Sequence, residues 1–242
     1  MITDMSQGRP AAILWRFTIP MLLSAVFQQL YNVADSVVAG RFVGEDALAA
    51  VGASFPITMI FMAVALGSNT GCSVIISQLF GAKETARMKT AVSTSVIAIL
   101  ALSALLTAGG FLFCEPLMRL LGSTDTILPE AEAYAVPILL AAPFHCSSLA
   151  LAQCLRAEGK SKESMAGQLA GGLLNIVLDP LFIYTLGMGI RGAGAATALS
   201  QVMVWAALLW FYVRGKTSVR ISVRQVARTP RMVKLVFTTG FP

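Results

Sequence analysis

The chain has 242 residues, of which 56% are hydrophobic and only 12% are charged, against about 25% charged in an average soluble domain. With a mean hydropathy of +0.75, it has too few polar side chains to cover a water-soluble globule of this size. This composition excludes an ordinary soluble domain and predicts a single all-α membrane domain. The net charge of +6 has to be interpreted from the positions of the basic residues.

Six apolar segments are long enough to cross a bilayer, which takes about 20 apolar residues in a helix. We therefore expect a six-helix transmembrane bundle over residues 1–213. A seventh apolar segment, residues 235–242, is too short to cross, and we expect it to be the truncated start of a further helix. In chain order, the six segments are Ile13–Val38, Val51–Leu79, Ala91–Cys114, Ala133–Leu155, Met165–Leu186 and Ala193–Val213.

Most of the 18 basic residues fall on one side of this predicted bundle, with only Arg41, Arg119 and Arg191 on the other. Cytoplasmic loops carry an excess of Lys and Arg, so we expect a cytoplasmic N-terminus. Residues 214–234 are then a basic cytoplasmic linker. The same rule explains the positive charge without a nucleic-acid partner, and it makes the lipid bilayer the expected partner.

Three aromatic residues, Trp15, Trp210 and Tyr212, lie at the predicted cytoplasmic ends of their helices. Trp and Tyr are enriched where a helix meets the membrane–water interface. We expect all three to be interfacial anchors.

The first predicted helix carries Gln28, Tyr31, Asn32 and Asp35 at the i, i+3, i+4, i+7 spacing, which forms one polar stripe on a helix. An Asp near the centre of a membrane helix costs about 2.5–3.5 kcal/mol on insertion scales. Such a residue normally faces a cavity or a partner, so the stripe predicts a polar lumen.

The fifth predicted helix repeats this geometry with Gln168, Gly171, Gly172, Asn175 and Asp179. Two helices with small and polar residues on one face predict a lumen shared between them. The alternative for both acids is a structural role, bonded to neighbouring helices or to interfacial water.

The predicted helix directions place Asp35, Asn175, Asp179 and Thr197 at a similar depth, in the outer half of the membrane. Carboxylates bind a proton or pair with Na⁺, and the amide and hydroxyl supply neutral oxygens. We expect these four residues to form a cation-coupling site, and to be metal ligands only if Na⁺ is the cation. Gln201, one turn after Thr197, is a further candidate for lining the cavity.

Pro20 and His145 are the other candidates inside the predicted helices. Pro20 precedes Asp35 in the same helix and removes a backbone hydrogen bond, so it predicts either a hinge or a static kink. His145 is the only histidine; we expect it to be a hydrogen-bonded packing residue, with a proton relay as the alternative.

Several sequence blocks, in order and spacing, resemble the multidrug and toxic compound extrusion (MATE) transporters over the whole chain. They are FTIPMLLSAVFQQLYNVADSVVAGRFVGEDALAAVG, ISQLFGAK, LRAEGKSK, LLNIVLDPLFIYTLGMGIRGAGAATALSQ and the terminal GFP. The resemblance implies a twelve-helix protein made of two six-helix lobes. This chain would be the N-terminal lobe, the linker and the start of helix seven, with the C-terminal lobe missing.

The resemblance also implies a function. Asp35 matches the family's helix-one acid, Asn175 and Asp179 its helix-five pair, Thr197 a helix-six hydroxyl, and Pro20 the proline where helix one bends. The expected protein is a bacterial plasma-membrane antiporter, not an enzyme. It would export organic, cationic, drug-like compounds by alternating access, driven by H⁺ or Na⁺ and without a cofactor.

Three alternatives remain open at this stage. A flippase for lipid-linked saccharides shares the two-lobe plan, but we expect a more basic cavity in such a protein. An intramembrane enzyme would need Asp35 and Asp179 as an aspartyl pair, without the usual helix motifs. Six helices could also pair as a homodimer.

Overall fold

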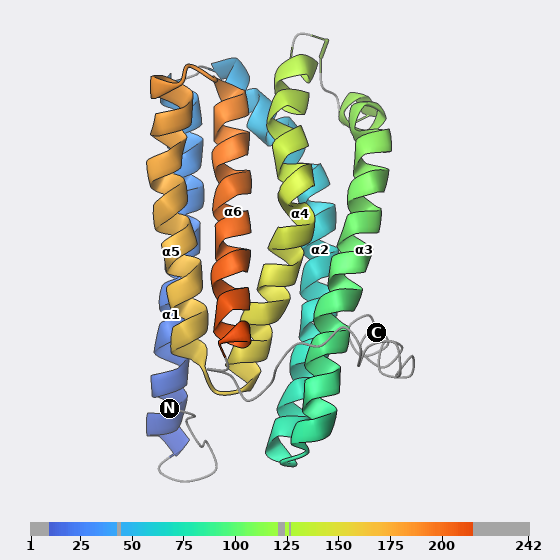
Figure 1. The fold of residues 1–242 in the computed structure, drawn as a ribbon. Helices are drawn as coiled ribbons and strands as arrows, with labels where there is room; N and C mark the ends of the chain where they lie inside the picture. Colours follow the sequence, from blue (N-terminus) through green and yellow to red (C-terminus); the bar gives the residue numbers. More distant parts are fainter. Residues whose placement is uncertain (1–9, 43–44, 121–123, 126, 215–242) are drawn as a thin grey trace.

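The described part of this computed structural model comprises residues 10–42, 45–120, 124–125 and 127–214, with the backbone alone at some positions of the first two helices. It is all-helical, as the sequence predicts (Figure 1). The α-helices are α1 (Pro10–Phe42), α2 (Glu45–Gly81), α3 (Thr85–Leu120), α4 (Leu128–Ala157), α5 (Ser161–Pro180) and α6 (Ile190–Val213); a π-helical segment, η1 (Leu181–Thr185), follows α5.

The helices alternate in direction and form an upright bundle (Figure 1). Helix α4 is central, because it packs against α2, α3, α5 and α6, whereas α1 packs mainly against α5. We use "lower end" for the end where α1 begins in Figure 1 and "upper end" for the opposite one. This arrangement brings α1, α4, α5 and α6 together around the polar residues of the candidate site.

Four helices of the described residues are long and apolar enough to cross a membrane: α3, α4, α5 with η1, and α6. Large apolar side chains such as Leu105 and Leu112 of α3 point outward, 71% and 75% exposed, a surface that lipid can cover. The chain is therefore a multi-pass membrane protein. In α1 and α2, shorter apolar stretches, Thr18–Leu30 and Val51–Ile60, fall among positions with undescribed side chains, so their crossing of the membrane stays a prediction.

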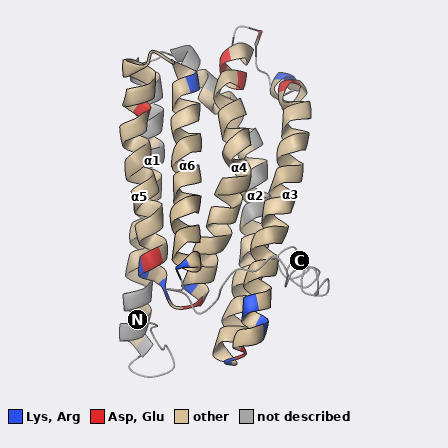
Figure 2. Cartoon of the chain, viewed as in Figure 1, with Lys and Arg blue, Asp and Glu red and all other residues tan. Residues whose placement is uncertain are grey.

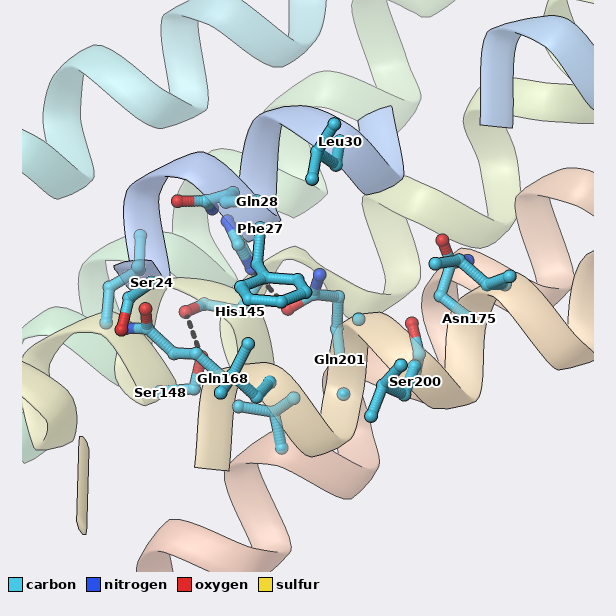
Figure 3. Close-up of a pocket in the computed structure, with 17 residues that line it drawn as sticks. Ser24, Phe27, Gln28, Leu30, His145, Ser148, Gln168, Asn175, Ser200 and Gln201 are labelled. Carbon is cyan, nitrogen blue, oxygen red and sulfur yellow. Dashed lines mark hydrogen bonds between the residues drawn. The ribbon is translucent and has the colours of Figure 1, made fainter. Parts of the chain in front are cut away.

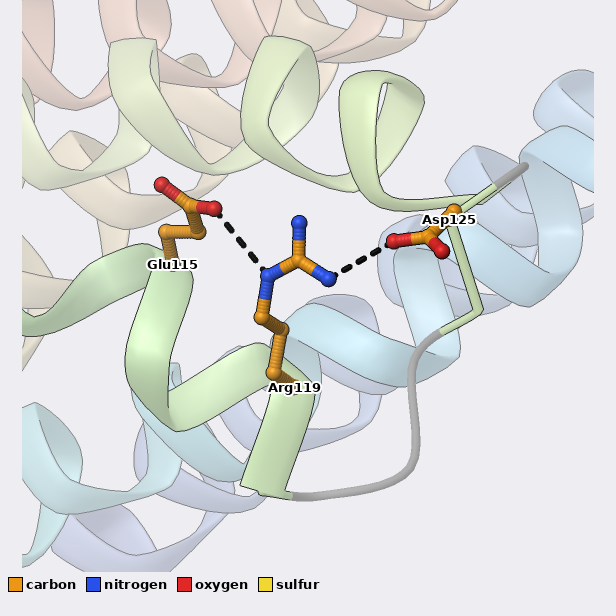
Figure 4. A network of polar contacts seen from close by, with 3 residues as sticks. All are labelled: Glu115, Arg119 and Asp125. Atoms are coloured by element: carbon orange, nitrogen blue, oxygen red, sulfur yellow. Dashed lines mark hydrogen bonds and ion pairs between the residues drawn. The ribbon is translucent and has the colours of Figure 1, made fainter.

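Charged residues of the described part gather at the two ends of the bundle (Figure 2). At the upper end, Arg119 donates hydrogen bonds to Glu115 (3.0 Å) and to Asp125 (2.6 Å), which links the end of α3 to the following loop (Figure 4). At the lower end, Glu158 and Lys160 form a buried ion pair, 3.5 Å apart, in the turn between α4 and α5. The exposed upper pairs add little stability, whereas the buried pair joins two residues of the turn itself.

The fifth helix departs from the prediction of one continuous segment to Leu186. It is α-helical only to Pro180, after which η1 takes over and the Leu186 N–H donates to the Leu181 carbonyl (3.0 Å). Proline has no N–H to continue the i to i−4 hydrogen bonds of the α-helix. After Pro180 the backbone changes to the wider π turn, with an i to i−5 hydrogen bond. Such π segments are frequent at functional sites, and this one begins two residues after Asp179.

For one of the three aromatic residues, the prediction of an interfacial anchor is wrong. Trp15 and Trp210 are exposed, but Tyr212 is 1% exposed, and its hydroxyl donates to the Leu151 carbonyl across the α4–α6 contact (3.3 Å). A buried Tyr normally finds such a partner. Its position at the helix end suggested the interface, whereas packing against α4 places it in the core.

Candidate functional site

A buried polar cluster joins α5 to α6 at the upper end. The side-chain amide of Asn175 donates to the Asp179 carboxylate (Nδ2 to Oδ1, 3.3 Å) and to the Thr197 hydroxyl oxygen (3.4 Å). Asn175 and Asp179 are each 1% exposed. Because they lie one turn apart on α5 and Thr197 is on the facing helix, one amide holds both partners. The structure thus brings together three of the four residues of the predicted cation site. We call these three the cation cluster, after that prediction.

The Asn175 carbonyl oxygen is the free acceptor of the cation cluster. Its Oδ1 is buried and has no hydrogen-bond partner among the described residues, an arrangement that costs about 1–3 kcal/mol. A carboxylate, a hydroxyl and an unused amide carbonyl therefore lie close together in a buried environment. Oxygen donors of this kind suit a proton or Na⁺. No group of three His, Cys, Asp or Glu side chains suited to a metal occurs among the described residues.

Asp35, the fourth predicted member, belongs to α1, which packs against α5. Its side chain lies outside the described residues, as do those of Tyr31 and Asn32. Their part in the site stays a prediction.

Pro20 is buried inside α1, which runs as one helix from Pro10 to Phe42. The Ser24 hydroxyl donates to the Pro20 carbonyl (2.9 Å), one turn further along. Such back-bonding is associated with helix bending. The hinge role of Pro20 stays a prediction.

Three cavities follow one another along the bundle. The middle cavity, about 170 Å³, lies between α1, α4, α5 and α6. The upper cavity, about 310 Å³, reaches Thr197 and Tyr134, and the lower one, about 180 Å³, reaches Arg156. Figure 3 shows Ser24 and Gln168 at one end of the middle cavity and Asn175 at the other. Asn175 lines the middle cavity and Thr197 the upper one, so the cation cluster borders both, although Asp179 lines neither. Most of the lining of these two cavities is apolar; the α5 stripe lines the middle one with Gln168, Gly171, Gly172 and Asn175, and Gln28 is the residue of the α1 stripe whose side chain is described there.

The predicted lining residues lie where the cavities meet. Gln28 lines all three cavities, Gln168 the middle and lower ones, and Gln201 the middle and upper ones. Three long amide side chains offer donors and acceptors to a ligand at several depths. This set suits a pocket that accepts varied polar groups.

His145 stands at the boundary between the middle and upper cavities. Its Nδ1 is 2.6 Å from Gln201 Oε1, and its Nε2 is 3.4 Å from Met62 Sδ. The contact with Gln201 fits the expected hydrogen-bonded packing role, yet the ring also lines both cavities. The sequence did not predict that His145 lines a cavity. The one feature that could have indicated it is the presence of a single histidine within an apolar helix.

Comparison with known proteins identifies the family. The MatE family profile matches residues 20–181. The probable multidrug resistance protein YoeA of Bacillus subtilis is 28% identical over 98% of this chain and 54% of its own length. The multidrug export protein MepA of Staphylococcus aureus is 26% identical over 93% of this chain and 50% of its own length.

Solved structures agree. A MATE crystal structure in the bent conformation superposes with a TM-score of 0.90 at 33% identity, over 97% of this chain and 52% of that chain. An outward-facing multidrug resistance MATE family transporter of the MOP superfamily gives the same values. This chain spans about half the length of the relatives it matches. From the profile match, the relatives and the shared fold together, the chain belongs to the MatE family.

Proposed function

We propose that this chain forms the N-terminal lobe of a two-lobe, cation-coupled exporter of organic cations. MATE family multidrug transporters are not enzymes, which removes the intramembrane aspartyl enzyme as an alternative. The relatives named for multidrug export and resistance support the substrate class, and the half-length match supports the two-lobe plan. The observation that supports the coupling proposal is the buried cation cluster beside the middle cavity, which Asn175 lines.

The coupling follows from the chemistry of Asp179. While ionised, a buried carboxylate favours a nearby organic cation. When a proton or Na⁺ binds at the cation cluster, that attraction is neutralised and the drug is released. Because the coupling cation and the drug compete for this one charge, each lowers the affinity of the protein for the other, and by the same factor. Alternating access then requires that the lobe rearrange between the loaded and the neutralised states, with Asp35 as the second titrating acid.

The charges around the cavities give less support to lipid-linked saccharides than to cations. No Asp or Glu of the described part of the chain lines the middle or upper cavity, so the preference for cations rests on Asp179, which is hydrogen-bonded to the cavity-lining Asn175. No Lys or Arg lines the middle or upper cavity among the described residues, whereas anionic pyrophosphate-linked lipids call for basic groups. The flippase alternative has less support than drug export, because Arg156 of the lower cavity is the one Lys or Arg that lines any of the three cavities in the part of the chain that the structure describes.

The function is tested in proteoliposomes that contain the two-lobe transporter. An imposed gradient of H⁺ or of Na⁺ is expected to drive a fluorescent organic cation against its own gradient, and an ionophore that collapses the gradient is expected to stop it. Dye transport that is equal with and without either cation gradient would contradict the coupling.

We further propose that the lower end faces the cytoplasm of a bacterial cell. The basis is the excess of basic residues, which bacterial inner-membrane proteins keep on the cytoplasmic side. The four native cysteines are buried, so maleimide labelling of an exposed, introduced cysteine can be told apart from any background of the native ones. On intact cells, a membrane-impermeant maleimide is expected to label Asp125→Cys at the upper end and not Glu84→Cys at the lower end; permeabilised cells should label both. The reverse pattern would invert the topology.

A further inference from the structure

The lower cavity has a different polarity from the rest of the interior. It lies between α1, α2, α4 and α5, and its lining includes Asn69, Gln153 and Arg156 together with the shared Gln28 and Gln168. One cation and no acid line it among the described residues. None of the cation cluster contributes to it, so it is a separate part of the interior.

Asn69 is an unpartnered side chain in this cavity. It is 1% exposed, and neither its amide nitrogen nor its carbonyl oxygen has a hydrogen-bond partner among the described residues. Buried polar groups are nearly always paired, by protein, water or ligand. Asn69 lines the cavity, so its unpaired amide belongs to the cavity wall.

Arg156 gives the cavity its charge. Its guanidinium is partly buried, and Nε donates to the Ala152 carbonyl of its own helix (3.3 Å). No described carboxylate pairs with it within 4.0 Å. A cation held in a poorly hydrated place without a counter-charge attracts an anion, and the planar fork of Arg matches a carboxylate.

We infer that the lower cavity is a subsite for a carboxylate of the exported compound, so that zwitterions are favoured over simple cations. This inference rests on the proposed export function. Gln168 joins the lower cavity to the middle one, and Asn175 lies seven residues further along α5, about 10 Å away. A zwitterion that extends from the lower cavity into the middle one places its carboxylate at Arg156 and Asn69 and its ammonium group toward the cation cluster.

The test uses a rhodamine with a free carboxylate and its methyl ester, which share one ring system and differ in that charge. Binding of each dye to the purified, detergent-solubilised 242-residue chain is measured by fluorescence polarisation. The acid is expected to bind about 10-fold more tightly than the ester, the effect of one hydrogen bond to a charged group. Arg156→Gln is expected to remove this preference by weakening the acid alone, and Asn69→Leu to reduce it in part.

Arg87→Gln is the control, because Arg87 is an exposed arginine of the lower end that pairs with Glu84 away from the cavity; it should keep the full preference. Equal binding of acid and ester by the wild-type chain would overturn the inference without any variant, as would an equal loss of both dyes in a folded Arg156→Gln protein. Gradient-driven export of the ester reports on the proposed function separately, since it needs the cation cluster and not the carboxylate subsite.

Discussion

Replacing Asp179 with Asn is expected to lower gradient-driven export by about 10-fold or more, within the 5- to 150-fold range of typical coupling energies. Asn has nearly the same volume as Asp, and its carbonyl oxygen still accepts the hydrogen bond from Asn175 Nδ2. The substitution therefore removes the charge and spares the α5–α6 contact. Without that charge, the binding of H⁺ or Na⁺ no longer changes the affinity for the drug.

The measurement is initial export rate in proteoliposomes, normalised to the amount of inserted protein. Glu163→Gln is the matched control, because Glu163 is an acid in the first turn of the same helix, at the opposite end from the cation cluster, and should retain the wild-type rate. Asp35→Asn is expected to behave like Asp179→Asn. Normal rates from both singly substituted proteins at normal expression would contradict the proposed coupling.

Gly194→Ala is expected to destabilise the bundle by about 1–3 kcal/mol, the usual cost of overpacking. A Cβ at Gly194 would lie 2.6 Å from the backbone carbonyl oxygen of Tyr134. That oxygen belongs to α4, so no side-chain rotation relieves the clash and α4 and α6 must separate. Thr197 lies one turn after Gly194 on α6, so the same shift is expected to weaken the hydrogen bond to Asn175.

The thermal unfolding midpoint in detergent measures this effect. Gly109→Ala is the control variant, because a Cβ at Gly109 meets nothing within 4 Å. The higher helix propensity of Ala should stabilise this variant slightly. A lowered midpoint is expected for Gly194→Ala alone. Equal midpoints for the two variants would show that the close approach of α4 and α6 does not limit stability.

The sequence predicts the helical architecture well because the signals are local. An apolar run long enough to cross a bilayer is visible without any tertiary information, and α3 to α6 each contain one. The helices extend beyond the apolar runs; α3 begins at Thr85 and not near Ala91. Polar residues continue a helix as readily as apolar ones, so hydropathy marks the membrane-embedded part and not the helix end.

The cation cluster was predictable in part for a similar reason. Asn175 and Asp179 share a helix face by spacing alone, and Thr197 follows from the reversal of direction between α5 and α6. The side-chain rotamers decide which atom of the Asn175 amide bonds to which partner. They also decide that its carbonyl oxygen has no hydrogen-bond partner among the described residues. The π segment after Pro180 was not predictable, because proline removes one backbone hydrogen bond without specifying the hydrogen-bond pattern that follows.

Contacts between distant helices were not predictable from this single sequence. His145 meets Gln201, 56 residues away, and Met62, 83 residues away; no periodic pattern encodes such pairings. Nothing in the sequence connects Asn69 with Arg156. Their common cavity exists because α4 crosses the bundle between α2 and α5, which is a property of the packed helices and not of either segment.

The most direct test of the account is the effect of the coupling cation on drug affinity. Binding of a fluorescent organic cation to the wild-type two-lobe transporter is measured at low and at about 100-fold higher H⁺, and separately Na⁺, at constant ionic strength. One of these cations is expected to raise the drug Kd at least about 5-fold, and Asp179→Asn to abolish that rise. A wild-type Kd that stays the same for both cations would contradict the claim that a buried carboxylate is shared between cation and drug.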